Sequence, residues 1–286
     1  MAESVQTIAS LRDGDAVDAV FACSRKDRLQ ARTGAPYLAL ELRDRTGAMA
    51  ARAFRDADVL AGRFERGDLV RVSGRVERFR DALQIDVRAI ARAQEADPAA
   101  FLPVAYRDVD ELDGFLEHLA GEVHDPGYRG VLERLLGDEA LRAEWRRAPC
   151  TRNGHHAYLG GLLEHTVAVA TLALEAAQLH PRLNPDLLLC AALVHDVGKT
   201  REFTYGAEIA VGEAGRLVGH VQLGIEILDA HGVPSDRRLE LVHCVLTHHG
   251  PEAAPGRRFA SPEALALYRL NALDASVKGA LEHGLP

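Results

Sequence analysis

The chain has 286 residues, which is enough for two domains with a hydrophobic core in each. Its content of 47% hydrophobic and 27% charged residues is ordinary for a globular protein, and no apolar run approaches the ~20 residues of a membrane span. The opening residues, MAESVQTIASLRDGD, lack the basic and then apolar pattern of an export signal, and the four scattered cysteines form no C-x-x-C pair. We therefore expect a cytoplasmic protein with free thiols and no membrane partner.

Charge is distributed unevenly along the chain. Residues 1–92 contain 17 Lys and Arg against 14 Asp and Glu, whereas the remaining residues contain 17 against 28. A mildly basic front part followed by an acidic part is compatible with nucleic acid that binds to the N-terminal region.

Residues from about 14 to 92 alternate apolar and polar side chains, the pattern of half-buried strands. The alternating runs cover residues 17–21, 38–42, 49–53, 69–76 and 83–87. A short helical stretch, residues 56–64, lies between the third and fourth runs. Five short strands with a helix at this position are typical of an OB-fold barrel.

Arginines and a few aromatic rings occupy the outward positions of this expected barrel. OB-folds bind single strands through a basic groove and stacking rings. The nucleic-acid contacts that we expect are Arg43, Arg52, Phe54, Arg71 and Arg75. The alternative is a generic small barrel with a solvated arginine face.

A change of pattern follows the barrel. Residues 93–109 are acidic and rich in alanine, and Pro98 and Pro103 interrupt them. From there the apolar period becomes 3.6, with amphipathic helices expected over 109–122 and 128–136. The sequence thus predicts an OB-fold domain over 1–92, a linker over 93–109 and a helical domain over 110–286.

An apolar helical run, residues 187–194, ends in His195-Asp196 and is followed by Gly198 and Lys199. An imidazole and a carboxylate at a buried helix end need a partner for their lone pairs, and a divalent metal is such a partner. Gly198 fits a helix C-cap with positive φ, and Lys199 would bring a cation close to an anionic substrate such as a phosphate. The alternative is an ion pair at a helix end.

Further histidines and an aspartate recur at the ends of expected helices or within them, and helices of a bundle can bring such residues to one point. The first ion would be bound by His165, His195, Asp196 and Asp274. The second would be bound by His220 and His248, with Asp196 as the bridging carboxylate. Two ions roughly 3.5–4 Å apart can support the hydrolysis of a phosphate ester. Nitrogen and oxygen ligands suit Mn, Fe, Co, Ni or Zn, and manganese is the ion that we expect first.

The order His … His-Asp … His … His … Asp resembles the HD-domain superfamily of metal-dependent phosphohydrolases. The phrases HHAYLGGLLEHT at 155–166 and THHG at 247–250 resemble one branch, the YhaM-type 3′→5′ exoribonucleases, which join an OB-fold to an HD domain. The resemblance covers residues from about 10 to about 280. It implies the six metal ligands given above, favours His248 over its neighbour His249, and implies that Lys199 faces the phosphate or the attacking hydroxide.

Asp196 and Lys199 are therefore the expected catalytic residues. Three further residues, His156, His249 and Glu164, are candidates for contacts with the ligands or the substrate. For His156 the alternative is loop capping. For Glu164 a solvated acid at a helix start is the interpretation that we favour.

These features predict an all-β OB-fold barrel followed by an all-α HD-domain bundle. The resemblance implies a metal-dependent 3′→5′ exoribonuclease that degrades single-stranded RNA, with single-stranded DNA as a further substrate, and releases 5′-nucleotides. One alternative is an HD-domain hydrolase of nucleotides or cyclic dinucleotides with a regulatory OB domain. Another is a non-catalytic single-strand-binding protein with a structural metal. The oligomeric state stays open, with a homo-oligomer as one option.

Overall fold

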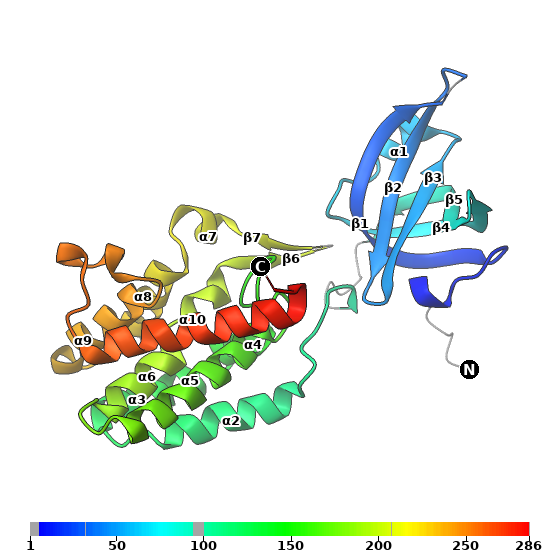
Figure 1. Ribbon diagram of the computed structural model, residues 1–286. Coiled ribbons are helices and arrows are strands. Elements are labelled where there is room, and N and C mark those ends of the chain that lie inside the picture. The colour runs from blue at the N-terminus through cyan, green and yellow to red at the C-terminus, as the bar shows by residue number, and fades with distance from the viewer. Residues whose placement is uncertain (1–5, 32, 94–99, 207, 286) are drawn as a thin grey trace. The chain divides into compact units, whose positions relative to one another are not determined.

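The computed structural model describes residues 6–31, 33–93, 100–206 and 208–285 and contains two compact units, one built of strands and one mainly of helices (Figure 1). No helix among these residues is long and apolar enough to cross a membrane. The boundaries 1–92, 93–109 and 110–286 stay a prediction, and residues 94–99 of the expected linker lie outside the described residues.

The first unit is a closed five-stranded barrel. Its strands are β1 (Ala16–Gln30), β2 (Pro36–Asp44), β3 (Gly47–Ala53), β4 (Leu69–Phe79) and β5 (Ala82–Arg92), with helix α1 (Ala57–Ala61) between β3 and β4. They close in the order β1-β2-β3-β5-β4. Only β3 and β5 are parallel among the described strand pairs of the barrel. This is the OB-fold that the sequence predicts.

Alternation along the strands builds the barrel core. Leu38, Leu40 and Leu42 of β2 are fully or almost fully buried, whereas Glu41 and Arg43 between and beside them are exposed. The period of two sends alternate side chains to opposite faces, so one face of each strand fills the interior. Apolar side chains around α1 complete the same cluster.

The second unit consists mainly of helices. These are α2 (Val109–Gly121), α3 (Pro126–Gly137), α4 (Glu139–Arg147), α5 (Gly161–Leu179), α6 (Pro185–Val194), α7 (Glu213–Leu217), α8 (His220–Ala230), α9 (Ser235–Thr247) and α10 (Pro262–His283). A short 3₁₀ helix, η3 (Val197–Arg201), follows α6. A two-stranded hairpin of β6 (Phe203–Tyr205) and β7 (Ile209–Val211) comes next in the chain, and its residues 205–210 belong to the first unit. The expected helices over 109–122 and 128–136 are confirmed, whereas α4 and the hairpin had not been expected.

Local chemistry explains where several helices begin. Asn184 accepts a hydrogen bond from the backbone N–H of Leu187 and stands before Pro185, and Ser261 caps α10 in the same way before Pro262. A short polar side chain satisfies a free N–H of the first turn, and proline is tolerated at the first helical position. The starts of α6 and α10, two helices that position the site, are therefore set by the sequence.

Helix α6 lies at the centre of this unit. Every residue from Leu187 to Val194 is buried, and α6 packs against α5, α9 and α10. Helix α10 runs beside α5 (Figure 1). A helix that is apolar all round belongs in a core, so the polar pair that follows Val194 is carried into the interior.

Candidate metal centre

Asp196 is fully buried just beyond the end of α6, and imidazoles surround its carboxylate. Its Oδ2 atom lies 3.4 Å from Nε2 of His195 and 3.5 Å from Nε2 of His165, on α5. The ammonium of Lys199 donates a hydrogen bond to the same oxygen at 2.7 Å. Burial raises the pKa of a carboxyl, but the charge of Lys199 together with the adjacent His195 and His248 outweighs it here and holds the pKa of Asp196 well below its ordinary value.

The other oxygen of this carboxylate faces a second group of histidines. Oδ1 of Asp196 lies 3.3 Å from Nε2 of His248 and 3.5 Å from Nε2 of His220, the first residue of α8. Nε2 of His249 lies 3.0 Å from Nε2 of His220. The ligand atoms of Asp196, His220, His248 and His249 all lie within 4.8 Å of one another. Both members of the His248-His249 pair thus reach the cluster, although the sequence favours His248.

The hydrogen bonds on the far side of the rings fix the tautomers. Nδ1 of His195 lies 2.8 Å from the carbonyl oxygen of Ala192, and Nδ1 of His248 lies 2.6 Å from that of Val245. A carbonyl oxygen only accepts, so each Nδ1 donates and each Nε2 of the neutral ring presents a lone pair to Asp196. Burial lowers the pKa of His195 well below its ordinary value, so its ring is neutral at pH 7.

These lone pairs indicate what the cluster lacks. Nε2 of His165 and Nε2 of His195 lie 3.2 Å apart, and in the described residues Oδ1 of Asp196 and Nε2 of His248 are buried without a hydrogen-bond partner. Acceptor atoms that face one another without a proton between them repel, and buried polar atoms without partners cost free energy. A divalent cation on either side of the carboxylate would satisfy all of them, so the residues present fit metal ions.

Asp274, on α10, lies on the opposite side of the His165 ring from Asp196. Its Oδ2 atom accepts from Nδ1 of His165 at 2.6 Å and from Nε2 of His156 at 3.0 Å. The structure therefore groups His165, His195 and Asp196 as one set of ligand atoms and Asp274 with His156 and His165 as another. Burial raises the pKa of Asp274, but the hydrogen bonds from His156 and His165 outweigh it, so the net pKa is low.

A network behind this aspartate includes Glu164 and His156. Glu164 is buried rather than solvated, because the hydroxyl of Tyr158 donates to its Oε2 at 2.7 Å and Lys278 donates to its Oε1 at 2.9 Å. Burial raises the pKa of Glu164, but His156, whose Nδ1 lies 3.9 Å from Oε2, and the hydrogen bonds from Lys278 and Tyr158 outweigh it and lower the pKa to about 2. The expectation of a solvated acid at the helix start is therefore wrong. Glu164 supports His156, which in turn holds Asp274.

Gly198 has a different role from the expected helix cap. Helix α6 ends at Val194, and Gly198 is not among the residues with positive φ. A Cβ atom at this position would lie 1.9 Å from the carbonyl oxygen of His220 and 2.5 Å from the backbone nitrogen of Gly224. The correction is therefore that Gly198 lets η3 approach α8 closely enough to bring His220 to Asp196.

Cys150 also reaches this centre, although no sequence pattern had marked it as a site residue. Its thiol is fully buried and accepts a hydrogen bond from Lys199 at 3.4 Å, and its Sγ lies 3.9 Å from Oδ2 of Asp196. Burial raises the pKa of Cys150 to about 12. Lys199, expected to face a phosphate, is thus held between Asp196 and Cys150. No local pattern marks Cys150, because it follows α4 in a loop with no periodicity.

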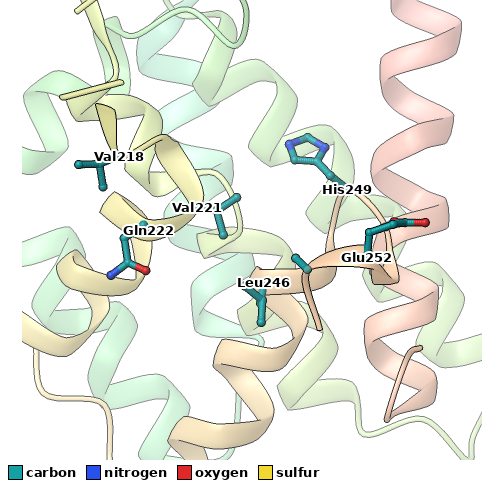
Figure 2. A pocket seen from close by; sticks show the side chains of 8 residues that line it. Val218, Val221, Gln222, Leu246, His249 and Glu252 are labelled. Atoms are coloured by element: carbon teal, nitrogen blue, oxygen red, sulfur yellow. The ribbon is translucent and has the colours of Figure 1, made fainter. Parts of the chain in front are cut away.

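The cluster opens to solvent beside His249. His165, His195 and His248 are fully buried, whereas His220 is partly exposed and His249 is exposed. A hollow of about 460 Å³ adjoins His249 (Figure 2). Its walls come from the residues around His220, from the last turn of α9 and from the chain after it, namely Val218, Val221, Gln222, Leu246, Gly250, Glu252 and Ala253.

The expected nucleic-acid residues of the barrel lie on or beside three strands, with Arg43 on β2. Arg52 and Phe54 lie at the end of β3, where the exposed ring of Phe54 stacks on Tyr37 with 5.4 Å between the ring centroids. Arg71 and Arg75 lie on β4, which pairs with β1 and β5.

The barrel arginines also differ in their partners. Arg71 is paired with Asp18 at 2.9 Å, and Arg75 donates to the carbonyl of Gly14 at 3.0 Å. Arg52 donates to the carbonyl of Ala51 at 2.9 Å, and Arg43 is exposed on β2. The tertiary structure therefore does not gather the five residues on one pair of strands.

Comparison with known proteins agrees with both units. Residues 162–276 match the family model of the HD domain, and residues 22–91 match that of an OB-fold nucleic acid binding domain. The chain is 25% identical over 272 residues to the 3′-5′ exoribonuclease YhaM of Listeria monocytogenes serotype 4b, covering 92% of this chain and 86% of that relative. It is 27% identical over 244 residues to the YhaM of Bacillus velezensis, covering 83% and 77%.

Among solved structures, the HD domain of the phosphodiesterase PgpH from L. monocytogenes has 20% sequence identity and a TM-score of 0.33, covering 52% of this chain and 76% of that one. The two family models and the relatives agree with the order of the two units along the chain. The chain therefore carries an OB-fold nucleic acid binding domain and an HD domain, and it is similar to YhaM exoribonucleases along most of its length.

Proposed function

We propose that this hydrolase is a metal-dependent 3′→5′ exoribonuclease that degrades single-stranded RNA, accepts single-stranded DNA, and releases 5′-nucleotides. The observation that carries the proposal is the buried carboxylate of Asp196, each of whose oxygens faces the Nε2 atoms of two histidines. The RNA substrate and the direction come from the similarity to the YhaM exoribonucleases.

Two divalent ions would bind on the two sides of Asp196, and Mn²⁺ is the ion that we expect there. The first would be held by His165, His195, Asp196 and Asp274, and the second by His220 and His248 with Asp196 shared. Such a pair lowers the pKa of water and stabilises charge on the phosphoryl oxygens. Asp274 at present contacts Nδ1 of His165, so its contribution includes orientation of that ring as well as its predicted role as a ligand.

The protein's own groups prepare this centre. Lys199 holds Oδ2 of Asp196 in place and adds a positive charge beside an anionic phosphate. The backbone carbonyls of Ala192 and Val245 keep the Nε2 lone pairs of His195 and His248 aimed at the carboxylate. The constellation is thus preorganised, with little reordering left for substrate binding.

The hollow beside His249 is the route by which we infer that the strand end arrives. It adjoins the most exposed histidine of the cluster, and its walls combine apolar Val218, Val221 and Leu246 with the amide of Gln222 (Figure 2). Apolar walls with a few polar groups, here Gln222, His249 and Glu252, suit a nucleoside attached to a phosphate at the cluster.

The barrel supplies affinity for the strand in this proposal. The exposed Phe54–Tyr37 stack offers a face to an unpaired base, and Arg43 offers a charge to the backbone. Binding of this kind tolerates many sequences and weakens as salt rises.

The test uses single-stranded RNA with a 5′ label, Mn²⁺ and a sequencing gel. We expect a descending ladder that starts at the 3′ end. The ladder should be absent with EDTA and in the Asp196→Asn variant. This substitution keeps the volume of the side chain, and the variant protein should still bind the RNA strand at low salt. Glu175→Gln, an exposed carboxylate on α5, is the matched control and should give the wild-type ladder.

Two outcomes would contradict the proposal. Immediate release of a labelled mononucleotide would reverse the direction. Intact RNA with metal bound would exclude the exoribonuclease, and a screen of mononucleotides and cyclic dinucleotides would then separate a small-nucleotide hydrolase from a binding protein with a structural metal.

A further inference from the structure

A fourth group of ligand atoms borders the metal centre and contains a thiol. Sγ of Cys150 lies 3.6 Å from Nε2 of His155, and the ligand atoms of Cys150, His155 and His165 all lie within 4.8 Å of one another. His155 is half-buried in the loop before α5, and the other two residues are fully buried. The group shares His165 with the centre built around Asp196.

The surroundings of Cys150 differ from those of the other buried thiols of the helical unit. Cys190 and Cys244 belong to the hydrophobic core, among aliphatic side chains. Cys150 instead contacts His155, the ammonium of Lys199 at 3.4 Å and Oδ2 of Asp196 at 3.9 Å. Among the described residues, it is the one cysteine that takes part in a potential metal-binding group.

Sulfur and imidazole are the ligands of soft divalent ions. Zn²⁺ and Cd²⁺ favour a thiolate with imidazoles, whereas Mn²⁺ and Mg²⁺ favour carboxylate and water oxygens. Three protein ligands with a fourth position open to water satisfy a tetrahedral ion. When such an ion binds, the thiol transfers its proton to solvent and the sulfur donates a lone pair to the metal.

We propose that Cys150, His155 and His165 form a binding site for thiophilic divalent ions, of the Zn²⁺ and Cd²⁺ class, that competes with the hydrolytic centre for His165. Nδ1 of His165 donates to Asp274, so Nε2, which faces Asp196 and His195, is the atom left to bind an ion, and it cannot serve both sites at once. Occupation of the thiol site therefore withdraws a ligand from the first ion of the hydrolytic centre. Only this inhibitory consequence rests on the proposed function; the binding itself does not.

The experiment titrates Cd²⁺ into the metal-stripped full-length chain and follows the ultraviolet absorbance of thiolate-to-cadmium charge transfer. We expect a saturable band equivalent to one thiolate in the wild type. Cys150→Ser and Cys150→Ala should both lack this band. Two different replacements are used so that an effect peculiar to one of them is not mistaken for loss of the thiolate ligand. Cys244→Ser, which removes another buried thiol of the same unit, should keep the band.

Two results would overturn the site. One is a wild type without the band, and the other is a band that persists in both Cys150 variants. Circular dichroism of each variant confirms that the helices are intact, so loss of the band through unfolding is recognised.

A second readout links the site to hydrolysis. With Mn²⁺ present, Zn²⁺ should inhibit RNA hydrolysis in the wild type. Cys150→Ser should need at least about tenfold more Zn²⁺ for the same inhibition, because removal of a group that only supports a ligand already costs about 10–100-fold in metal affinity and Cys150 is a ligand itself. Equal sensitivity of the two proteins would refute the competition. A band without any hydrolysis of RNA by the wild type would refute the proposed function and leave the thiol site standing.

Discussion

The metal centre depends on the absence of a side chain at Gly198. The nearest atoms to its absent Cβ are backbone atoms of His220 and Gly224, which cannot rotate away as a flexible side chain would. Both neighbours belong to the first turns of α8, and α8 begins with the ligand His220. Any side chain at position 198 must therefore displace a predicted ligand.

The substitution Gly198→Ala should lower the free energy of unfolding by about 2–3 kcal/mol, the cost of overpacking a rigid contact. It should also weaken Mn²⁺ binding, because His220 moves away from Asp196. Urea denaturation and a Mn²⁺ titration measure the two effects.

Gly279→Ala on α10 is the control, since nothing lies within 4 Å of its added methyl group. It should stabilise the helix by up to about 1 kcal/mol. Unchanged urea midpoints in Gly198→Ala would contradict the close approach.

At the scale of elements, an ion-pair network joins α2 to α4. Asp113 of α2 is buried and accepts from Arg142 at 2.8 and 3.1 Å and from Arg146 at 2.5 Å. Burial raises the pKa of Asp113, but the hydrogen bonds from the two arginines outweigh it and leave the pKa lowered. The network fixes α4, whose Trp145 is buried in the core.

We expect Asp113→Asn to lower the free energy of unfolding at pH 7 by about 3 kcal/mol. This is the lower end of the cost of breaking a buried ion pair, because both arginines keep some contact with water. A lowered pKa in the folded state gives stability that is present above the unfolded pKa and is lost as the pH falls through the folded pKa. The difference between wild type and variant should therefore narrow below about pH 4.

Urea denaturation across this pH range measures the difference. Asp110→Asn, which removes the exposed partner of Arg146, should cost at most about 1 kcal/mol. A difference between wild type and Asp113→Asn that stays constant from pH 7 to pH 3 would show that the charge of Asp113 plays no part.

For the whole molecule, metal binding and stability of the helical unit should be coupled. Helices α5, α6, α8 and α9 and the segments that follow them supply the histidines around Asp196, so an ion there links elements that are distant in sequence. A ligand that binds only the folded state stabilises it by mass action.

Mn²⁺ at about 100 times its Kd should raise the free energy of unfolding by about 2.7 kcal/mol per site, and EDTA should remove the gain. Thermal unfolding with and without Mn²⁺ measures it. In Asp196→Asn the increase should vanish, because the shared carboxylate is lost, whereas Glu175→Gln should respond like the wild type. An Asp196→Asn protein whose Tm still rises with Mn²⁺ would place the ions elsewhere.

The sequence by itself determined the elements with a strong period. Alternation along residues 38–42 and 69–76 predicted barrel strands, and the apolar run ending at Val194 predicted the buried helix that carries His195 and Asp196 into the core. These patterns are local consequences of burying one face of a strand or every face of a helix, so they can be read without the partners. The order of the histidines and aspartates likewise indicated which residues to test as ligands.

Only the tertiary structure decided which atoms of those residues meet. Helix packing placed Asp274 on the Nδ1 side of His165, buried Glu164 under Tyr158 and Lys278, and brought Cys150 to Lys199. The three-residue strands β6 and β7 are too short to display a period. Contacts of this kind join segments far apart in the chain, and their geometry depends on the packing of several helices at once. The periodicity of residues along the chain does not specify how those helices pack against one another.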